Sequence, residues 1–135
     1  MSTGLEHVLV LSDDIDATRD FYRDIVGLRV GPRPALEFAG YWLYADARSA
    51  CVHVAERHAY LKHAASLGLP ASGVGSSHSG GGAIDHIAFT EGDYDAVAAR
   101  IGAAGITPVQ NAVPGGPRQL FLHDPNGIRI EINVM

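Results

Sequence analysis

The feature that most restricts the fold of this chain is an internal repeat. The segments HVLVLSDDIDA (7–17) and HIAFTEGDYDA (86–96) both run from a histidine through a β-type stretch to Asp, an apolar residue, Asp and Ala at the same offsets. Such self-similarity indicates one supersecondary unit built twice. We therefore expect the 135 residues to fold as two related halves within one compact unit.

Each half continues into an amphipathic helix. The first helix, DIDATRDFYRDIVG, has an acidic cap region at Asp13 and Asp14 and Gly27 at its predicted C-terminal cap. The second places apolar residues on one helical face and ends near Gly102 or Gly105; the face consists of Tyr94, Val97, Ala98 and Ile101. A short strand is then predicted around Val30 and around Val109, equally far from the two histidines.

The repeat extends to the end of each half. YWLYADARSACVHVAE (41–56) matches QLFLHDPNGIRIEINV (119–134) as strand, Asp turn and strand, with Asp46 opposite Asp124 and His53 opposite Glu131. Each half is therefore predicted to be a βαβββ module in an α+β fold. The expected division is a first module over 1–57, a connector over 58–82 and a second module over 83–135. The connector is predicted to be helical over 59–68 and is rich in Gly and Ser over 72–82.

Composition restricts the classes of partner. Apolar residues make up 47% of the chain and charged residues 19%, as in globular proteins. The net charge of −5 and the lack of a Lys/Arg run argue against nucleic acid and anionic membranes, and no stretch is apolar for long enough to span a bilayer. We therefore expect a cytoplasmic protein with a small-molecule partner, in which Cys51 is a small buried thiol.

Four residues interrupt mostly apolar strand faces at positions related by the repeat. His7 and His86 lie in the first strand of each half, and His53 and Glu131 lie in the last. Neutral imidazole nitrogens and a carboxylate oxygen are suitable ligands for Zn, Ni, Co, Mn or Fe. The alternative is that each histidine is a hydrogen-bonded core or interface residue. Four repeat-related positions favour a divalent metal site.

The segments HVLVLSDDIDATRDFYRDIVGL and QLFLHDPNGIRIEI resemble the opening and closing segments of the vicinal oxygen chelate superfamily. This superfamily includes glyoxalase I, methylmalonyl-CoA epimerase, fosfomycin resistance proteins, bleomycin-binding proteins and extradiol dioxygenases. The resemblance implies a glyoxalase-like fold in which paired βαβββ modules form a cup-shaped mixed sheet around a divalent metal. It also implies that His7, His86 and Glu131 are metal ligands, with His53 at the fourth ligand position.

Departures from the family pattern bear on the reaction. Phe121 stands where ring-cleaving dioxygenases of this family carry Tyr, and AVPGGP stands where they carry a His several residues upstream of that Tyr. His53 stands where glyoxalases carry a carboxylate. The leading hypothesis is an isomerase or lyase acting on a metabolite that chelates the metal through adjacent oxygens, with Glu131 as general base. The alternatives are an Fe(II)-dependent extradiol-type dioxygenase and a non-catalytic drug-binding protein.

Side chains around the expected cup are candidate substrate contacts: Phe38, Trp42, Tyr44, Tyr60, Arg118, Gln119 and Phe121. Aromatic residues stack flat ligands, but on strands they more often belong to the core. The connector could let the two modules pair within one chain or across a homodimer, which is the expected assembly.

Overall fold

The computed structural model describes residues 2–69 and 80–135. The first module contains β1 (Val8–Ser12), α1 (Ile15–Asp20), the π-helical segment η1 (Phe21–Val26), β2 (Arg29–Gly31), β3 (Gly40–Tyr44) and β4 (Val52–Glu56). Helix α2 (Arg57–Ser66) follows it. The second module contains β5 (His86–Glu91), α3 (Tyr94–Ala103), β6 (Val109–Ala112), β7 (Arg118–His123) and β8 (Arg129–Val134).

The two modules have the same topology. Their strand orders are β1-β4-β3-β2 and β5-β8-β7-β6, and in each sheet the first strand pairs in parallel with the last. The predicted α+β fold of two βαβββ modules is therefore confirmed. The helix expected within the connector is also present, as α2. Most of the Gly/Ser-rich tract predicted over 72–82 lies outside the described residues.

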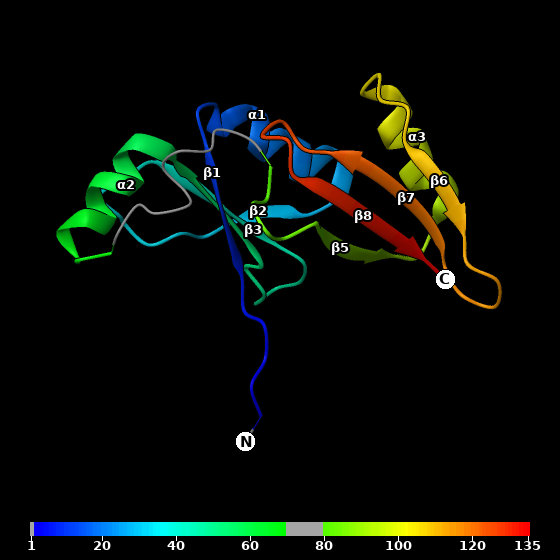
Figure 1. Ribbon diagram of the computed structural model, residues 1–135, viewed down its shortest axis with the longest axis horizontal. Helices are drawn as coiled ribbons and strands as arrows, with labels where there is room; N and C mark the ends of the chain where they lie inside the picture. The colour runs from blue at the N-terminus through cyan, green and yellow to red at the C-terminus, as the bar shows by residue number, and fades with distance from the viewer. Residues whose placement is uncertain (1, 70–79) are drawn as a thin grey trace.

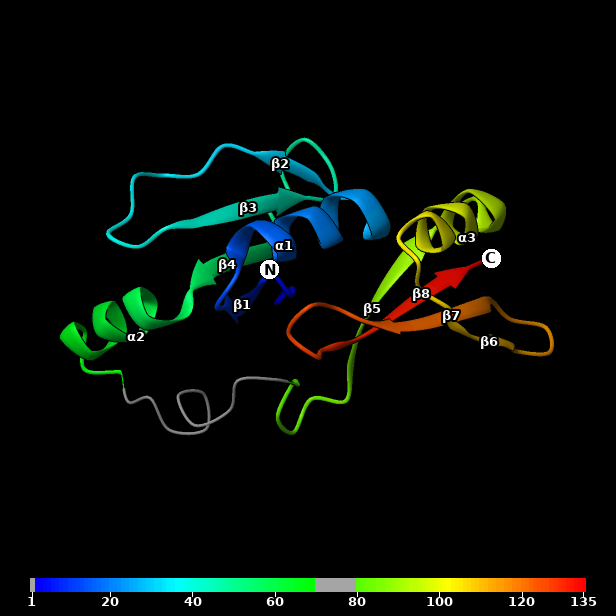
Figure 2. The same ribbon diagram turned by 90° about the horizontal axis from the view of Figure 1, so that it is seen from above.

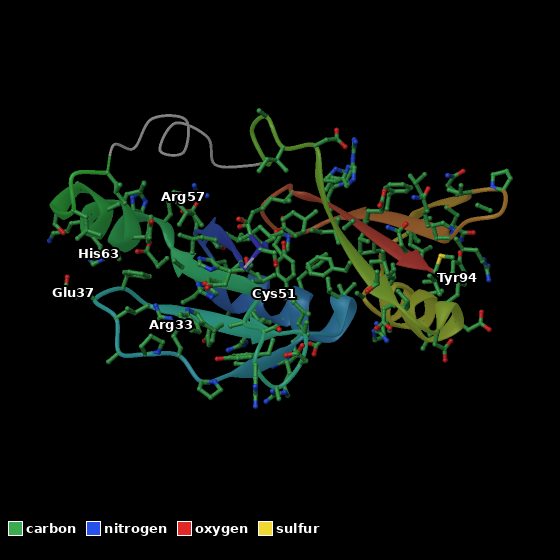
Figure 3. The ribbon with its side chains drawn as sticks, turned by 90° about the horizontal axis from the view of Figure 1, so that it is seen from below. Arg33, Glu37, Cys51, Arg57, His63 and Tyr94 are labelled. Carbon is green, nitrogen blue, oxygen red and sulfur yellow. The ribbon has the colours of Figure 1, made fainter. Side chains whose placement is uncertain are left out.

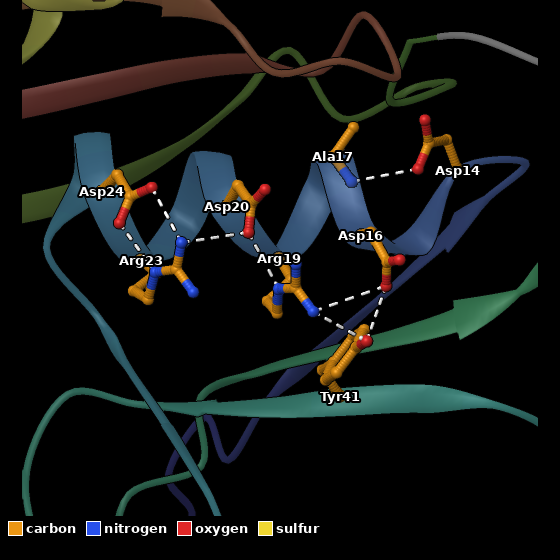
Figure 4. Close-up of polar contacts among 8 residues, drawn as sticks. All are labelled: Asp14, Asp16, Ala17, Arg19, Asp20, Arg23, Asp24 and Tyr41. Atoms are coloured by element: carbon orange, nitrogen blue, oxygen red, sulfur yellow. Dashed lines mark hydrogen bonds and ion pairs between the residues drawn. The ribbon is translucent and has the colours of Figure 1, made fainter.

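The first helix begins and continues for local reasons. Asp14 caps it by accepting a hydrogen bond from the Ala17 amide, at 3.0 Å. Along its exposed side, ion pairs alternate down the helix, as Figure 4 shows; they join Arg19 to Asp16 and Asp20, and Arg23 to Asp20 and Asp24. Tyr41 on β3 connects this side to the sheet, since its hydroxyl donates to Asp16 and accepts from Arg19.

The continuation of this helix, η1, has the wider π-helical turn, which the apolar spacing did not predict. Four of its residues are buried, namely Phe21, Tyr22, Ile25 and Val26. The segment ends at Gly27, whose φ of +95° is a left-handed conformation that favours glycine. The predicted C-terminal cap at this glycine is confirmed.

Each sheet has an apolar face against the helices and a second face that carries the polar residues. In β8 the apolar face consists of Ile130, Ile132 and Val134, all at most 4% exposed, and α3 adds Val97 and Ile101 to the same core. Because side chains alternate along a strand, Arg129, Glu131 and Asn133 lie on the other face. The candidate site therefore lies on the side of the sheet away from α3.

The two modules are joined through α1 and η1, which lie between the two sheets in both Figures 1 and 2. Helix α2 lies at one end of the elongated molecule and α3 toward the other. The buried Tyr22 hydroxyl donates to Asp124 at 2.8 Å, and Asn126 donates to Thr18 at 3.0 Å. Burial, with Asp124 beside the phenol, raises the pKa of Tyr22.

The two hairpins differ by one residue. Trp42 pairs with His53, eleven positions later, whereas Phe121 pairs with Glu131, ten positions later. The ungapped match of 41–56 with 119–134 is therefore wrong by one residue in its first strand, although His53 and Glu131 remain equivalent. Consequently Trp42, and not the buried Leu43, occupies the place that Phe121 has in the second module.

Candidate functional site

The second module brings two of the predicted ligands together. Glu131 pairs with Ala88 in the parallel β5–β8 ladder, so His86, two residues before Ala88, points from the same face. His86 Nε2 and Glu131 Oε1 lie 3.8 Å apart. Two donor atoms that each bind one ion at about 2.0–2.2 Å can lie up to about 4.2 Å apart. This pair is therefore within the spacing of two ligands of one metal.

His7, directly before β1, and His86, the first residue of β5, are each held by the carboxylate that precedes them in sequence. His86 Nδ1 lies 2.8 Å from Asp85, and His7 Nδ1 lies 2.8 Å from Glu6. A carboxylate on one ring nitrogen orients a metal-binding histidine and directs the other nitrogen outward. Sequence reasoning missed Glu6 and Asp85; the signal was an acidic residue directly before each histidine of the repeat.

The acidic partner of His86 is itself oriented by a cation. Arg129 Nη1 lies 3.1 Å from both carboxylate oxygens of Asp85. The hydrogen bond to His86, with the nearby Arg129, lowers the pKa of Asp85. Asp85 is therefore ionised at neutral pH and can accept from His86.

In the first module the two predicted ligands belong to a stack of three rings. The centroids of His7 and His53 are 3.8 Å apart and those of His53 and Trp42 are 4.0 Å apart, with both ring pairs within 10° of parallel. Burial lowers the pKa of His53, and the charges of His7 and Arg33 act in the same direction. His53 is therefore neutral at physiological pH, the form that binds a metal or accepts a proton.

A row of side-chain amides crosses the second sheet to Glu131. Asn111 donates to Gln119 at 2.7 Å, and Gln119 donates to Asn133 at 3.1 Å. Asn133 then donates to Glu131 Oε2 at 2.8 Å. This row, from β6 to β8, holds one carboxylate oxygen while the other faces His86. Gln119, predicted as a substrate contact, has both polar ends of its amide bonded within this row.

A small pocket of about 160 Å³ opens beside the ring stack. Three of the candidate substrate contacts line it, namely Phe38, Trp42 and Tyr60, together with His7, His53 and Arg33. Phe38 and Tyr60 meet edge to face, with centroids 5.2 Å apart. The pocket therefore combines aromatic walls with the first-module ligand pair.

The other candidate contacts lie elsewhere. The Tyr44 hydroxyl donates to the Pro32 carbonyl. Arg118 lies over the ring of Tyr94 on the helix-facing side of its sheet, 3.3 Å from the ring centre. Phe121 lies beside Glu131 across the β7–β8 ladder. Cys51 is partly buried, and burial raises the pKa of its thiol; Figure 3 shows it near the centre of the molecule.

The donor types fit a divalent metal, but within residues 2–69 and 80–135 no three His, Cys, Asp or Glu side chains gather closely enough to hold one. The two pairs, His7 with His53 and His86 with Glu131, lie in different modules. Nor does any helix in the described part of the chain have the length and hydropathy to cross a membrane.

Comparisons with known proteins agree with this architecture. The protein called Glyoxylase I 4 from Arabidopsis thaliana is 29% identical over 134 residues, which span 96% of this chain and 70% of that protein. A glyoxylase/bleomycin resistance protein/dioxygenase domain from Frankia sp. EAN1pec superposes with a TM-score of 0.71 at 16% identity, covering 99% of this chain and 93% of that one.

A variant of the fosfomycin resistance protein FosX from Listeria monocytogenes, solved with Mn(II) and dihydroxypropylphosphonic acid, gives a TM-score of 0.69 at 17% identity, again covering 99% and 93% of the two chains. The family model of the Glyoxalase/Bleomycin resistance protein/Dioxygenase superfamily matches residues 4–132. Nearly the whole described chain, with both βαβββ modules and all four ligand-type residues, falls within that match. The chain therefore belongs to the Glyoxalase/Bleomycin resistance protein/Dioxygenase superfamily.

Proposed function

We propose that this protein is a divalent-metal-dependent isomerase or lyase acting on a small metabolite with adjacent oxygen atoms. The observation that carries the proposal is the paired environment of His7 and His86. Each has its Nδ1 against a carboxylate and each lies beside a second ligand-type residue, His53 or Glu131. A carboxylate on one ring nitrogen and a second ligand-type residue nearby are typical of a metal-binding histidine and are not required of an isolated core histidine.

The metal site is proposed to form between two copies of the chain. The His7 and His53 pair of one copy would meet the His86 and Glu131 pair of a second copy, in a homodimer. Strands β1 and β5, which carry or adjoin these histidines, are both edge strands of their sheets. Leu5 and Ile84, two residues before each histidine, are 89% and 63% exposed, which supports contact with another surface there.

The bound metal would supply Lewis acidity for a developing enolate. Glu131 would take the proton from the carbon beside the substrate carbonyl, because it is the one carboxylate among the four ligand-type residues. Asn133 holds Glu131 Oε2, so Oε1, which faces His86, would have to leave the metal before it could accept the proton. His53, being neutral, can bind the metal or accept a hydrogen bond from the substrate.

The first test is elemental analysis of the purified protein beside a His86→Ala/Glu131→Ala variant. We expect near-stoichiometric metal in the wild type and loss of it in the variant. Iron would favour the alternative of oxygen insertion, whereas Zn, Ni, Co or Mn would favour the isomerase or lyase. An anaerobic assay distinguishes the two reactions, because only oxygen insertion requires O₂. A wild type that takes up none of these ions after reconstitution would contradict the proposal.

The role of Glu131 is tested by exchange of solvent deuterium into a panel of α-hydroxyketones, followed by NMR. We expect Glu131→Gln to abolish exchange while metal content falls only in part, because an amide oxygen can still bind a metal but cannot accept the proton. Exchange at the wild-type rate in this variant would exclude Glu131 as the base.

Co-expression of two inactive variants tests whether the site crosses two chains. One carries His7→Ala and His53→Ala, and the other carries His86→Ala and Glu131→Ala. If the site forms between copies, each mixed dimer contains one intact site and recovers metal. If metal stays absent from a mixed dimer of demonstrated composition, the site is built within one chain.

A binding protein without catalysis is the second candidate. The aromatic walls of the pocket, Phe38, Trp42 and Tyr60, favour it, because such walls stack flat ligands. It predicts ligand binding by the metal-free protein and no deuterium exchange with any member of the panel.

A further inference from the structure

Arg33 stands out in the pocket beside the ring stack. It lies just after β2 and is only partly exposed. Its Nε is the one buried side-chain nitrogen or oxygen in the described part of the chain that has no hydrogen-bond partner. A buried N–H without an acceptor is destabilising, and more so when the group is charged. The Nε–H of Arg33 therefore has no acceptor among the described residues.

The charge of Arg33 is also unbalanced. Its Nη2 donates to the Phe38 carbonyl at 2.6 Å, and its guanidinium carbon lies 5.3 Å from the centre of the Phe38 ring. Among the described residues no carboxylate lies within ion-pair distance of it. The buried Arg57, by contrast, pairs with Asp13 at 3.0 Å. A half-buried cation without an anion is unfavourable unless a ligand supplies the negative charge.

The nearby acidic residue does not serve this purpose. Glu37 lies four residues after Arg33, but its carboxylate is directed to His63, with Oε2 and Nδ1 3.4 Å apart. Figure 3 shows Glu37 and His63 together at the end of the molecule where α2 lies. The Glu37 side chain is 85% exposed and its charge is largely screened by water.

The other residues of the pocket indicate what kind of molecule carries the anionic group. Its walls are the rings of Phe38, Trp42 and Tyr60 and the aliphatic side chains of Leu9, Leu36 and Val54. His7 and His53, the first-module ligand pair, also line it. A ligand that matches this lining therefore has an oxyanion for Arg33, a flat apolar body for the aromatic and aliphatic side chains, and polar atoms for His53.

We propose that the substrate is a small oxyanion with a flat apolar body, an aromatic or conjugated carboxylate or phosphonate, whose anionic group binds Arg33. This inference rests on the proposed function for the statement that the occupant is a substrate. The binding of the anion to Arg33 rests only on the pocket. Arg33 is a specificity residue, which selects anionic ligands over neutral ones of the same shape.

The test uses the fluorescence of Trp42, the single tryptophan of the chain, which lies in the pocket wall. Wild-type protein freed of metal is titrated with benzoate, phenylphosphonate and the neutral benzamide. Benzoate or phenylphosphonate should bind at least about tenfold more tightly than benzamide, since only the anions can form a hydrogen bond with Arg33 in which both partners are charged. Whichever of benzoate and phenylphosphonate binds more tightly shows whether the site prefers a carboxylate or a phosphonate.

Arg33→Gln should reduce this preference to within about twofold of equal binding. The matched control is Arg48→Gln, which removes the same charge from an exposed loop between β3 and β4; it should leave the preference unchanged. Thermal melts confirm that each variant is folded. If Arg33→Gln does not fold, the comparison of benzoate with benzamide in the wild type still decides the question.

Equal binding of benzoate, phenylphosphonate and benzamide would overturn the inference, and so would an anion preference that survives in folded Arg33→Gln. No change in Trp42 fluorescence with any probe also counts against it. Metal content, measured on the same preparations before the metal is removed and after reconstitution, keeps the two proposals separate. A protein that binds no metal but shows Arg33-dependent anion binding would refute the metal enzyme and support the anion pocket.

Discussion

Asp85 and Glu6 each orient the histidine that follows them in the sequence. Asp85 and Glu6 are exposed, yet each contacts the Nδ1 of the following histidine at 2.8 Å. Each carboxylate determines which ring nitrogen of its histidine carries the proton. It adds little to the free energy of folding, because exposed ion pairs are weak.

Removing the Asp85 side chain should therefore weaken metal binding without unfolding the protein. We expect Asp85→Ala to lower metal affinity about 10- to 100-fold, measured by competition with a chelating dye. Asp95→Ala is the control, since Asp95 is an equally acidic residue on α3, which covers the other side of the sheet. Equal affinities of Asp85→Ala and wild type would show that His86 needs no such support.

Cys51 provides a second prediction at the scale of one residue. Burial raises the pKa of its thiol, so less thiolate is present at pH 8 than in the unfolded chain. Alkylation by iodoacetamide should be slower in the native protein than in urea, and below its pKa the native rate should rise about tenfold for each pH unit. Equal native and unfolded rates would contradict this.

At the scale of helices and strands, local signals were enough to predict most of the structure. The repeat predicted both βαβββ modules, and Asp14 and Gly27 marked the ends of the first helical segment, because caps depend on neighbouring backbone groups alone. The π-helical turn of η1 and the extra residue between Trp42 and His53 were not predicted. Both depend on packing against other elements, which sequence spacing does not show.

The candidate site was predictable to a similar degree. The repeat indicated the four ligand-type residues and the faces of the strands that carry them. It did not indicate that His7 with His53 and His86 with Glu131 would lie as two separate pairs, because that depends on how the modules pack. Arg33 and the amide row ending at Asn133 were missed as well, since their roles come from contacts between strands and loops.

Substitution of Gly40 tests the strand packing around the pocket. A methyl group at Gly40 would overlap the carbonyl oxygen of Val54 on the paired strand and approach Arg33. We expect Gly40→Ala to lower the free energy of unfolding by about 1–3 kcal/mol or more. Gly102→Ala on α3, where a methyl group meets nothing within 4 Å, should instead raise it by about 0.5 kcal/mol. Urea denaturation measures both, and equal effects would contradict the packing.

At the scale of the whole molecule, a few buried polar contacts join the two modules. Tyr22 is fully buried, and its hydroxyl reaches Asp124 in the turn between β7 and β8. Asn126 of the same turn donates to Thr18, whose hydroxyl in turn donates to Ser12. Arg100 of α3 also donates to the Ile25 carbonyl at the end of η1. Buried networks of this kind favour one relative arrangement.

The contribution of this network can be measured by removing one hydroxyl. Tyr22→Phe should lower the free energy of unfolding by about 1–3 kcal/mol, because Asp124 loses a buried donor. Tyr44→Phe removes a hydroxyl from an exposed contact with Pro32 and should cost less. If the two variants are equally stable in urea, the contact between Tyr22 and Asp124 does not hold the modules together.

The same contacts have a consequence for how the protein can be made. Since α1 and η1 bind the second module through their own side chains, we expect that arrangement to form without a covalent link between residues 69 and 80. Two separately expressed fragments, 1–69 and 80–135, should therefore recognise each other and assemble into the native fold. The two fragments would then form a split protein, whose native fold is restored by association of the fragments.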